Sequence, residues 1–179
     1  MIAIIDYGAG NIFSVKNALD YLGLPGELTA DPEKIRKADA LILPGVGAFP
    51  SAMQMLHDSG LTDVIREESH KKPFLGICLG MQLIFEKGYE FEECDGLGLV
   101  PGKVEKIEAP GMVIPHMGWN SIHLQNEGRL FKGISQESYV YFVHSYYLKA
   151  EEEEIIKATT EYSTHIHASV EKGNLFACQ

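Results

Sequence analysis

The sequence predicts a three-layer α/β fold with a mostly parallel central sheet flanked by helices. Short apolar runs alternate with segments of helical periodicity through the first half of the chain, which is typical of strand–helix–strand units with right-handed crossovers. The 179 residues, of which 45% are hydrophobic and 22% charged, suit one buried core. We therefore expect a single domain over residues 1–179.

The first half of the chain predicts these elements in order. A buried strand at Ile2–Ile5 precedes a helix that Asn11 can cap and Gly23 can end. The apolar positions of this helix follow helical spacing and are Ile12, Val15, Leu19 and Leu22. A second buried strand, Ala40–Leu43, ends at Pro44-Gly45. Two helical segments and a third strand follow, at Ala52–Leu56, Leu61–Ser69 and Phe74–Ile77.

Beyond Gly96 the predicted elements are short strands separated by glycine, proline and acidic turns. These strands are Val104–Ile107, Tyr139–Val143, Ile155–Ala158, Ile166–Val170 and Leu175–Cys178. The run Glu151–Glu154 is expected to be a solvated turn.

Charge and cysteine content narrow the class of protein. A net charge of −10 disfavours a nucleic-acid partner or an anionic membrane surface. Three cysteines without CxxC spacing indicate a reducing compartment rather than a disulfide frame. The apolar start Met1–Ile5 is too short for a signal peptide, and no segment approaches the length of a membrane span. We expect a cytoplasmic protein.

The segment Gly76-Ile77-Cys78-Leu79-Gly80 is the strongest indication of chemistry. It follows an apolar run and precedes Met81–Glu86, which is predicted to be helical, so it has the form of a nucleophile elbow carrying a thiol. Both glycines must lack a Cβ if strand and helix are to approach closely, and a helix N-terminus would favour the thiolate. The N–H of Leu79 would point to an oxyanion formed by attack of Cys78. The alternative is a buried cysteine in a glycine-rich turn.

Two further loops follow predicted strands, and parallel sheets place ligands at the carboxyl ends of their strands. In Pro44-Gly45-Val46-Gly47 the N–H of Val46 could be a second oxyanion donor, although an ordinary Pro-Gly turn also fits. The loop Asp6–Asn11 invites comparison with the dinucleotide fingerprint. Phe13 stands where that fingerprint needs a small residue, and no ribose-binding carboxylate follows, so we expect no dinucleotide and no cofactor.

From Met1 to Gln179 the chain resembles the glutaminase subunits of imidazole glycerol phosphate synthases, a family of class I, triad-type glutamine amidotransferases. The resemblance implies the flavodoxin-like fold of that class and one glutamine amidotransferase domain. The matching segments are Ile5-Asp6-Tyr7-Gly8-Ala9-Gly10-Asn11, Leu43-Pro44-Gly45-Val46-Gly47-Ala48-Phe49, Gly76-Ile77-Cys78-Leu79-Gly80-Met81-Gln82, Pro115-His116-Met117-Gly118-Trp119-Asn120, Tyr141-Phe142-Val143-His144-Ser145-Tyr146-Tyr147 and Phe176-Ala177-Cys178-Gln179.

The resemblance implies that Cys78 attacks the side-chain amide of L-glutamine, releases ammonia and forms a thioester that water hydrolyses to glutamate. Backbone N–H groups of Val46 and Leu79 would form the oxyanion hole. The residues expected to hold glutamine are Gly45, Gly47, Gln82, His144, Ser145 and Tyr146. From the sequence alone, Gln82 could equally be an exposed helix residue, and Tyr141–Tyr147 a core strand.

The family's partner is a TIM-barrel synthase (cyclase) subunit of histidine biosynthesis, to which the ammonia passes. Trp119 is the only tryptophan, and tryptophans are mostly buried, which favours a core position. The resemblance instead implies that Asn11, Met117, Trp119 and Asn120 face the synthase, where a tryptophan would suit an interface hot spot.

The family continues after the counterpart of Gln179 with Phe-His-Pro-Glu, whose histidine is the general base and whose glutamate orients it. The 179 residues end at Gln179, so the expected domain lacks its C-terminal segment. We expect the sequence to cover the ordered part of a longer chain, and a chain truly lacking the segment to have negligible glutaminase activity. Among the other histidines, His144 is the best substitute base. His57 and His70 are expected to face solvent.

His165 and His167 share a predicted strand face, but no third ligand is evident, so we expect no metal site. Three other functions remain open. The chain could be another class I glutaminase, such as that of pyridoxal phosphate synthesis, although such a protein should lack the Asp-Tyr-Gly-x-Gly-Asn and Met-Gly-Trp-Asn segments. It could be a cysteine hydrolase or chaperone-like protein of similar architecture. It could also be an inactive module that binds the synthase.

Overall fold

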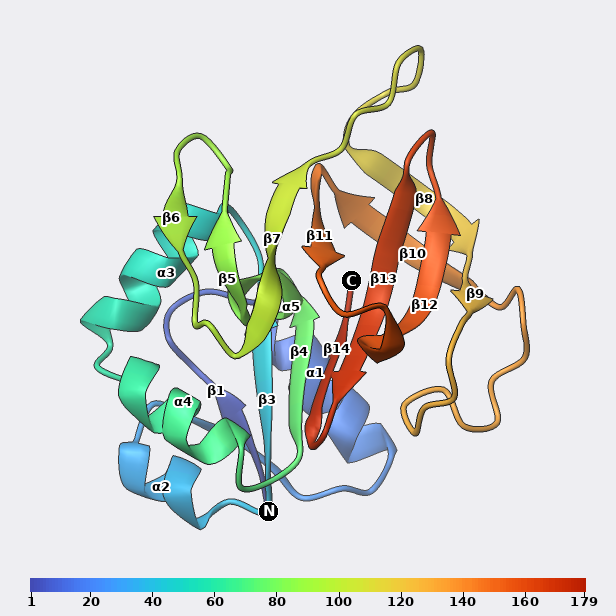
Figure 1. The fold of residues 1–179 in the computed structure, drawn as a ribbon. Coiled ribbons are helices and arrows are strands. Elements are labelled where there is room, and N and C mark those ends of the chain that lie inside the picture. Colours follow the sequence, from blue (N-terminus) through green and yellow to red (C-terminus); the bar gives the residue numbers. More distant parts are fainter.

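Fourteen strands and five α-helices make up residues 1–179 in the computed structural model (Figure 1). The helices are α1 (Ile12–Tyr21), α2 (Pro32–Lys37), α3 (Phe49–Asp58), α4 (Thr62–Ser69) and α5 (Leu79–Leu83), with a 3₁₀ turn η1 at Glu153–Ile155. The strands are β1 (Ile2–Ile5), β2 (Gly26–Thr29), β3 (Ala40–Gly45), β4 (Phe74–Cys78), β5 (Phe85–Gly88), β6 (Cys94–Asp95), β7 (Val100–Lys106), β8 (His116–Ser121), β9 (His123–Leu124), β10 (Tyr139–His144), β11 (Tyr146–Ala150), β12 (Ile156–Glu161), β13 (His165–Lys172) and β14 (Leu175–Cys178).

One twelve-stranded sheet runs through the molecule in the order β2-β1-β3-β4-β14-β13-β11-β7-β5-β6, with β12 and β9 continuing from β13. The strands from β2 to β14 pair in parallel, and the pairings from β14 to β7 are antiparallel. β8 and β10 form a separate antiparallel pair, which we call the β8–β10 ribbon.

Helices cover both faces of the parallel strands, which confirms the predicted three-layer α/β fold. Successive side chains of a strand point to opposite faces. Ile5 and Leu43 therefore join the main core beneath α2 to α5, whereas Ile4 and Ile42 pack with Leu19 of α1 on the other face. In Figure 1, α1 lies behind the sheet, on the side opposite α3 and α4.

The predicted first helix is confirmed, since the Asn11 side chain accepts a hydrogen bond from the Ser14 N–H and the helix ends at Tyr21. The helix predicted at Met81–Glu86 is wrong in extent, because α5 ends at Leu83 and β5 begins at Phe85. β5 pairs in parallel with β7 and antiparallel with β6, so pairing within the sheet overrides the local helical pattern.

Several elements were not predicted. β2 is short and contains glycine, and α2 has only six residues, although Asp31 caps it and Pro32 starts it in the way expected of a helix N-terminus. The predicted strand Tyr139–Val143 is confirmed as β10, but the chain turns at Ser145 into the unpredicted β11, which joins the large sheet.

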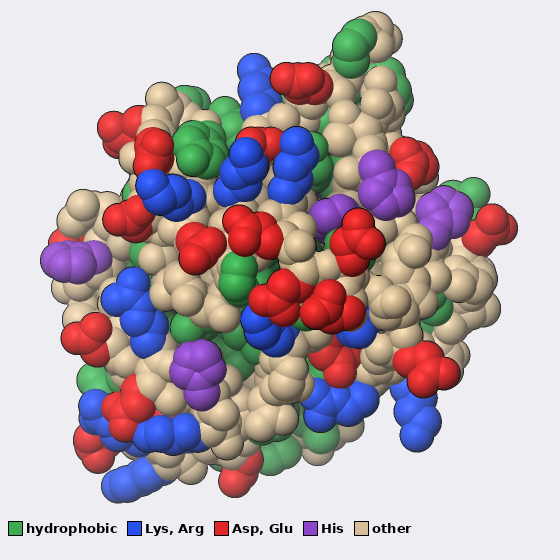
Figure 2. Space-filling view, in the orientation of Figure 1, with side chains coloured by type: hydrophobic (Ala, Val, Ile, Leu, Met, Phe, Trp, Pro, Cys, Tyr) green, Lys and Arg blue, Asp and Glu red, His purple; other side chains and the backbone are tan.

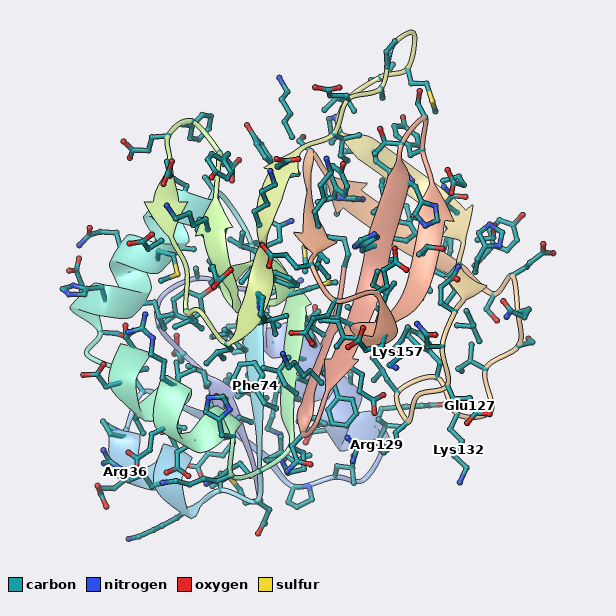
Figure 3. The ribbon with its side chains drawn as sticks, viewed as in Figure 1. Arg36, Phe74, Glu127, Arg129, Lys132 and Lys157 are labelled. Atoms are coloured by element: carbon teal, nitrogen blue, oxygen red, sulfur yellow. The ribbon has the colours of Figure 1, made fainter.

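Arg129 (Figure 3) links the segment between β9 and β10 to the β13–β14 hairpin through hydrogen bonds and a cation–π contact. The Glu171 carboxylate accepts hydrogen bonds from the backbone N–H of Arg129 at 2.7 Å and from its Nε at 2.9 Å. The guanidinium also lies over the Phe176 ring, 4.7 Å from the centroid. These contacts hold a segment without regular structure against the end of the sheet.

Acidic and basic side chains are interspersed on the face shown in Figure 2, with no continuous patch of either sign. Many of them pair, as Lys103 and Lys149 do with Glu105. None of the helices is long and apolar enough to cross a membrane.

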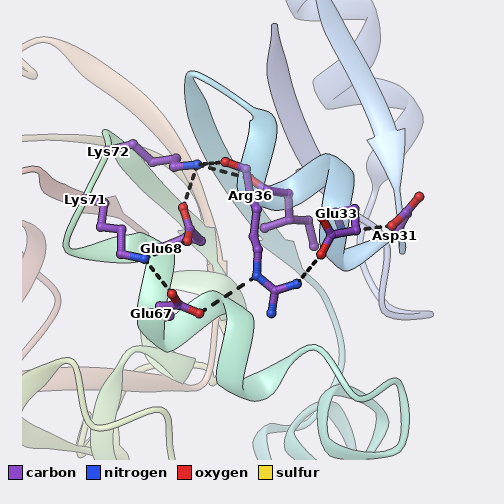
Figure 4. A network of polar contacts seen from close by, with 8 residues as sticks. Asp31, Glu33, Arg36, Glu67, Glu68, Lys71 and Lys72 are labelled. Carbon is purple, nitrogen blue, oxygen red and sulfur yellow. Dashed lines mark hydrogen bonds and ion pairs between the residues drawn. The ribbon is translucent and has the colours of Figure 1, made fainter.

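A polar network joins the end of α4 to α2 (Figure 4). Lys72 Nζ lies 2.7 Å from the Glu68 carboxylate and donates to the backbone carbonyls of Arg36 at 2.7 Å and Ile35 at 3.2 Å. Those carbonyls belong to the last turn of α2, where helical carbonyls lack their usual partners four residues on. The Ile35 carbonyl also accepts from the Ala38 N–H at 3.3 Å. The Lys72 and Glu68 side chains are only 11% and 6% exposed, and the Lys72 hydrogen bond lowers the pKa of Glu68. Lys71 also pairs with Glu68 but is 53% exposed.

We expect Lys72→Met to lower the free energy of unfolding by about 2–3 kcal/mol, because it leaves a buried carboxylate with one partner fewer and uncaps α2. Lys71→Met is the matched control and should lower the free energy of unfolding far less than Lys72→Met, because the lysine that it removes is exposed. Urea denaturation of the two variants makes the comparison. Equal losses would show that burial does not distinguish the two lysines.

Candidate active site

A cavity of about 450 Å³ opens where β3 and β4 end. Its walls come from the β3–α3 loop, the start of α5, the β10–β11 corner and Gln179. The lining residues are Val46, Gly47, Cys78, Leu79, Gln82, Glu90, Pro115, Val143, His144, Ser145, Tyr146 and Gln179.

Cys78 lies on a strained turn between β4 and α5, with φ 57° and ψ −117°. A Cβ at Gly76 would lie 2.8 Å from the Gly80 carbonyl oxygen, and one at Gly80 would lie 1.9 Å from the carbonyl oxygen of Leu43. Neither position has room for a side chain. The predicted nucleophile elbow, with its two obligatory glycines, is confirmed as a structure.

Burial raises the pKa of the Cys78 thiol, and hydrogen bonds from the Leu79 N–H and the Gln179 side chain oppose this effect without overcoming it. The N–H of Leu79 at the start of α5 thus favours the thiolate as expected, but burial outweighs it and the pKa of the thiol stays raised. α5 has only five residues, so few aligned peptide dipoles are available to offset the lost solvation of the Cys78 thiolate. Gln179 Nε2 lies 3.5 Å from Sγ, and no imidazole is within hydrogen-bonding distance of the sulfur.

The β3–α3 loop lies beside the thiol. Val46 and Gly47 line the cavity, and Gly47 has φ +98°, a conformation that favours glycine. Gly45 was expected to contact substrate but does not line the cavity. It is paired with Cys78 in the sheet, and a Cβ there would lie 2.7 Å from the Gly80 nitrogen, so its lack of a side chain serves packing.

The loop Asp6–Asn11 supports the β3–α3 loop from outside the cavity. The hydroxyl of Tyr7 donates to the Pro44 carbonyl at 3.0 Å. Burial and the nearby Cys78 raise the pKa of Tyr7, which keeps this hydroxyl a donor.

Gln82 is buried, so the alternative of an exposed helix residue is wrong. Its side-chain nitrogen donates to the Tyr146 carbonyl at 3.1 Å and to Gln179 Oε1 at 2.8 Å. Gln82 thus ties together three walls of the cavity that are far apart in sequence.

His144, Ser145 and Tyr146 form the corner between β10 and β11 and line the cavity as expected. Both ring nitrogens of His144 are engaged, Nδ1 with the Tyr146 carbonyl at 2.8 Å and Nε2 with His116 at 3.0 Å. Burial, with a further contribution from His116, lowers the pKa of His144 to about 4. His144 is therefore not arranged to take a proton from Cys78, and its suggested role as substitute base is wrong.

Glu90 is a lining residue that sequence reasoning missed. Its carboxylate accepts a hydrogen bond from the Phe49 N–H at 2.7 Å, at the N-terminus of α3. It comes from the β5–β6 hairpin, which no sequence pattern places beside Cys78. Pro115 and Gln179 were also missed as lining residues.

Of the residues expected to face a partner, Met117, Trp119 and Asn120 belong to the β8–β10 ribbon, whereas Asn11 caps α1. Trp119 is 69% exposed and contacts Tyr141 edge to face, with ring centroids 5.7 Å apart. The core position favoured from tryptophan statistics is therefore wrong. Met117 and Asn11 are exposed as well, whereas Asn120 is partly buried and its amide points inward to the Glu161 carbonyl.

The remaining histidines lie outside the cavity. His57 and His70 are exposed, as predicted. His165 and His167 lie on β13, and no group of three or more His, Cys, Asp or Glu side chains is arranged to hold a metal ion.

The chain is similar to known proteins over nearly its whole length. A family model described as glutamine amidotransferase class-I matches residues 3–179. The imidazole glycerol phosphate synthase subunit HisH of Moorella thermoacetica is 50% identical over 179 residues, covering 99% of this chain and 85% of the relative. The protein of the same name from Bacillus thuringiensis subsp. konkukian is 48% identical over 180 residues, covering 100% of this chain and 85% of the relative.

Solved structures share the fold. A crystal structure described as a glutamine amidotransferase matches with a TM-score of 0.77 at 18% identity, covering 99% of this chain and 88% of that chain. The structure of PurLQS from Thermotoga maritima matches with a TM-score of 0.72 at 18% identity, covering 99% and 85%.

The lowered pKa of His144 makes stability depend on pH. Its folded pKa of about 4 lies below the ordinary value of 6.5. Between pH 4 and pH 6.5 the unfolded chain binds more protons than the folded chain. The contribution of neutral His144 to the free energy of unfolding is therefore fully present above pH 6.5 and is lost as the pH falls through 4. We expect the loss to reach at most about 3 kcal/mol.

The matched variant is His144→Asn, which keeps an N–H beside the Tyr146 carbonyl but does not titrate. Denaturation at a series of pH values should show a shallower dependence for this variant than for the wild type. Parallel curves would mean that His144 does not change its protonation on unfolding.

Proposed function

The chain belongs to the class-I glutamine amidotransferase family, and from this premise we propose that it is the glutaminase subunit of an imidazole glycerol phosphate synthase. The observation that carries the proposal is the strained Cys78 facing a cavity beside a glycine-rich loop. The 50% identity to a HisH subunit supports this particular synthase over the glutaminase of pyridoxal phosphate synthesis.

In the proposed reaction, the Cys78 thiolate attacks the side-chain carbonyl carbon of L-glutamine. The Leu79 and Val46 N–H groups stabilise the resulting oxyanion, an interaction in which each donor is typically worth about 10²–10³ in rate. The tetrahedral intermediate collapses to a γ-glutamyl thioester and ammonia leaves. Water then attacks the thioester, which releases glutamate and regenerates the free thiol.

The raised pKa of Cys78 means that this reaction needs a base to remove the thiol proton. The hydrogen-bond partners of Cys78 in residues 1–179 are an amide and a backbone N–H, neither of which is a base. The family resemblance assigns the base to the histidine of the Phe-His-Pro-Glu segment that follows the counterpart of Gln179.

The cavity has the chemistry to hold an amino acid. A volume of about 450 Å³ accommodates glutamine, and Glu90 supplies a carboxylate that can pair with the α-ammonium group. Gly47 and the Ser145–Tyr146 corner offer backbone groups to the remainder of the substrate. Gln82 is better placed to hold the walls than to bind glutamine, since its nitrogen already donates twice.

We assign the outer face of the β8–β10 ribbon, with Trp119 and Met117, to a TIM-barrel cyclase subunit that consumes the ammonia in histidine biosynthesis. Exposed aromatic residues of this kind are enriched at interface hot spots. Asn11 would extend the contact from the α1 side. Such a complex would act in the cytoplasm.

The test is the release of glutamate and ammonia from glutamine by the chain mixed with its cyclase partner. The chain continued through the family's Phe-His-Pro-Glu segment should be active, and residues 1–179 alone should be at least about 10³-fold slower. Cys78→Ser should abolish the activity, whereas Cys94→Ser, a half-buried cysteine outside the cavity, should leave it intact. Activity that survives Cys78→Ser would refute the proposal.

A second candidate function is an inactive module that binds the synthase. The observation that favours it is the neutral, buried thiol without a hydrogen-bonded base. The same assay decides between them, because this module would bind the partner while the continued chain released no ammonia.

We expect Trp119→Ala to weaken binding to the cyclase subunit by about 30-fold, the loss of a typical hot spot. Because the side chain is mostly exposed, the free energy of unfolding should change by less than about 0.5 kcal/mol. Titration calorimetry and thermal denaturation measure the two effects. Tyr21→Ala, which removes an aromatic side chain 91% exposed at the end of α1, is the control. Unchanged affinity for Trp119→Ala would remove the ribbon from the interface.

A further inference from the structure

A continuous chain of hydrogen bonds runs from the β8–β10 ribbon to the wall of the cavity. It begins at Asn120, whose Nδ2 lies 3.3 Å from His116 Nε2. His116 Nδ1 lies 3.0 Å from His144 Nε2, and His144 Nδ1 lies 2.8 Å from the Tyr146 carbonyl oxygen. Of these residues, His144 and Tyr146 line the cavity and His116 does not.

The partners at the two ends fix the direction of every bond. A carbonyl oxygen only accepts, so His144 must carry its proton on Nδ1, and a neutral ring then accepts at Nε2. His116 must therefore donate from Nδ1 and accept at Nε2.

The Asn120 amide meets this requirement at the other end. Its Oδ1 accepts from the Ser121 N–H at 2.9 Å and its Nδ2 donates to the Glu161 carbonyl at 2.9 Å, so the nitrogen faces His116. Both imidazoles are thus neutral, and each has one permitted tautomer.

His116 has little freedom to move. It is 2% exposed and lies between two aromatic rings, with centroid distances of 4.7 Å to Phe142 and 4.1 Å to Tyr162. It also faces His144 directly across the ribbon. Its Nδ1–H is therefore aimed at His144 by packing as well as by hydrogen bonding.

We propose that His116 is a positioning residue for glutamine binding: its Nδ1–H holds the His144 ring at Nε2, and His144 in turn holds the Tyr146 carbonyl and the corner that walls the cavity. This inference rests on the proposed function. It adds a residue that never touches substrate and that acts through two others.

Removing the Nδ1–H has a defined consequence. His144 Nε2 is left as a buried acceptor without a donor, a state that is costly. The ring relieves the cost by turning Nε2 toward another donor or a water molecule, which weakens the bond from Nδ1–H to the Tyr146 carbonyl. The Ser145–Tyr146 corner then loses a fixed partner and moves away from the position that binds glutamine.

The experiment uses two variants of His116 in the complex with the cyclase subunit. His116→Phe keeps an aromatic ring between Phe142 and Tyr162 but has no donor. His116→Asn places an amide N–H where Nδ1 lies. His123→Phe, a change on the same stretch of chain at a histidine without a side-chain hydrogen bond, is the control.

We expect His116→Phe to raise KM for glutamine about tenfold with kcat changed less than about threefold, because the lost interaction holds bound substrate and transition state alike. His116→Asn should return KM to within about threefold of the wild type. His123→Phe should leave both constants unchanged.

The hydrogen bond from His144 to Tyr146 is read independently by NMR of the imidazole N–H groups. In the wild type and in His116→Asn, the His144 Nδ1–H proton should lie downfield and exchange slowly with water, and in His116→Phe it should move upfield and exchange faster. An unchanged His144 Nδ1–H signal in His116→Phe, an unchanged KM in a folded His116→Phe, or equal KM values for the Phe and Asn variants would overturn the inference. A wild-type complex that makes no glutamate would refute the proposed function instead, and the Nδ1–H signal would still decide whether His116 holds His144.

Discussion

The close approach of two backbones at Gly80 is the constraint on which the site depends. A side chain there would collide with the Leu43 carbonyl. Because Gly80 has none, α5 can start directly against the end of β3. This contact puts Cys78 beside the β3–α3 loop and leaves the thiol in the wall of a cavity rather than inside the sheet. Gly76 and Gly45 serve the same contact from the neighbouring strands, which explains why three glycines surround one cysteine.

The part of the site that is local in sequence was predictable. The elbow, the Gly47 loop and the parallel strands β1, β3 and β4 follow from apolar runs, glycine spacing and the rule that ligands lie at strand ends. Glu90 and the interaction of Gln82 with Tyr146 were not predictable, because they depend on β5 and β11 reaching the parallel strands from far along the chain. The prediction of where α5 ends was wrong for the same reason, because the pairing of Phe85 in β5 outweighs the helical pattern of Met81–Glu86.

The protonation of the site also depends on distant contacts. A thiol at a helix N-terminus and a histidine in a cavity both suggest acid–base chemistry at the level of sequence. In the structure, a five-residue helix does little against the desolvation of Cys78, and both nitrogens of His144 are bound to fixed partners. The polar groups that line this cavity are therefore mainly structural, and they fix the shape into which a substrate and a base must fit.

The two strands of the β8–β10 ribbon pair only with each other, and the ribbon packs on the large sheet through its inner side chains, Phe142 among them. Its outward residues, including Trp119 and Tyr141, take no part in the backbone pairing of the twelve strands. Substitutions there can accumulate during evolution without disturbing the sheet that positions Cys78. The exposed face of the ribbon and the geometry of the nucleophile are thus free to diverge at separate rates within one small protein.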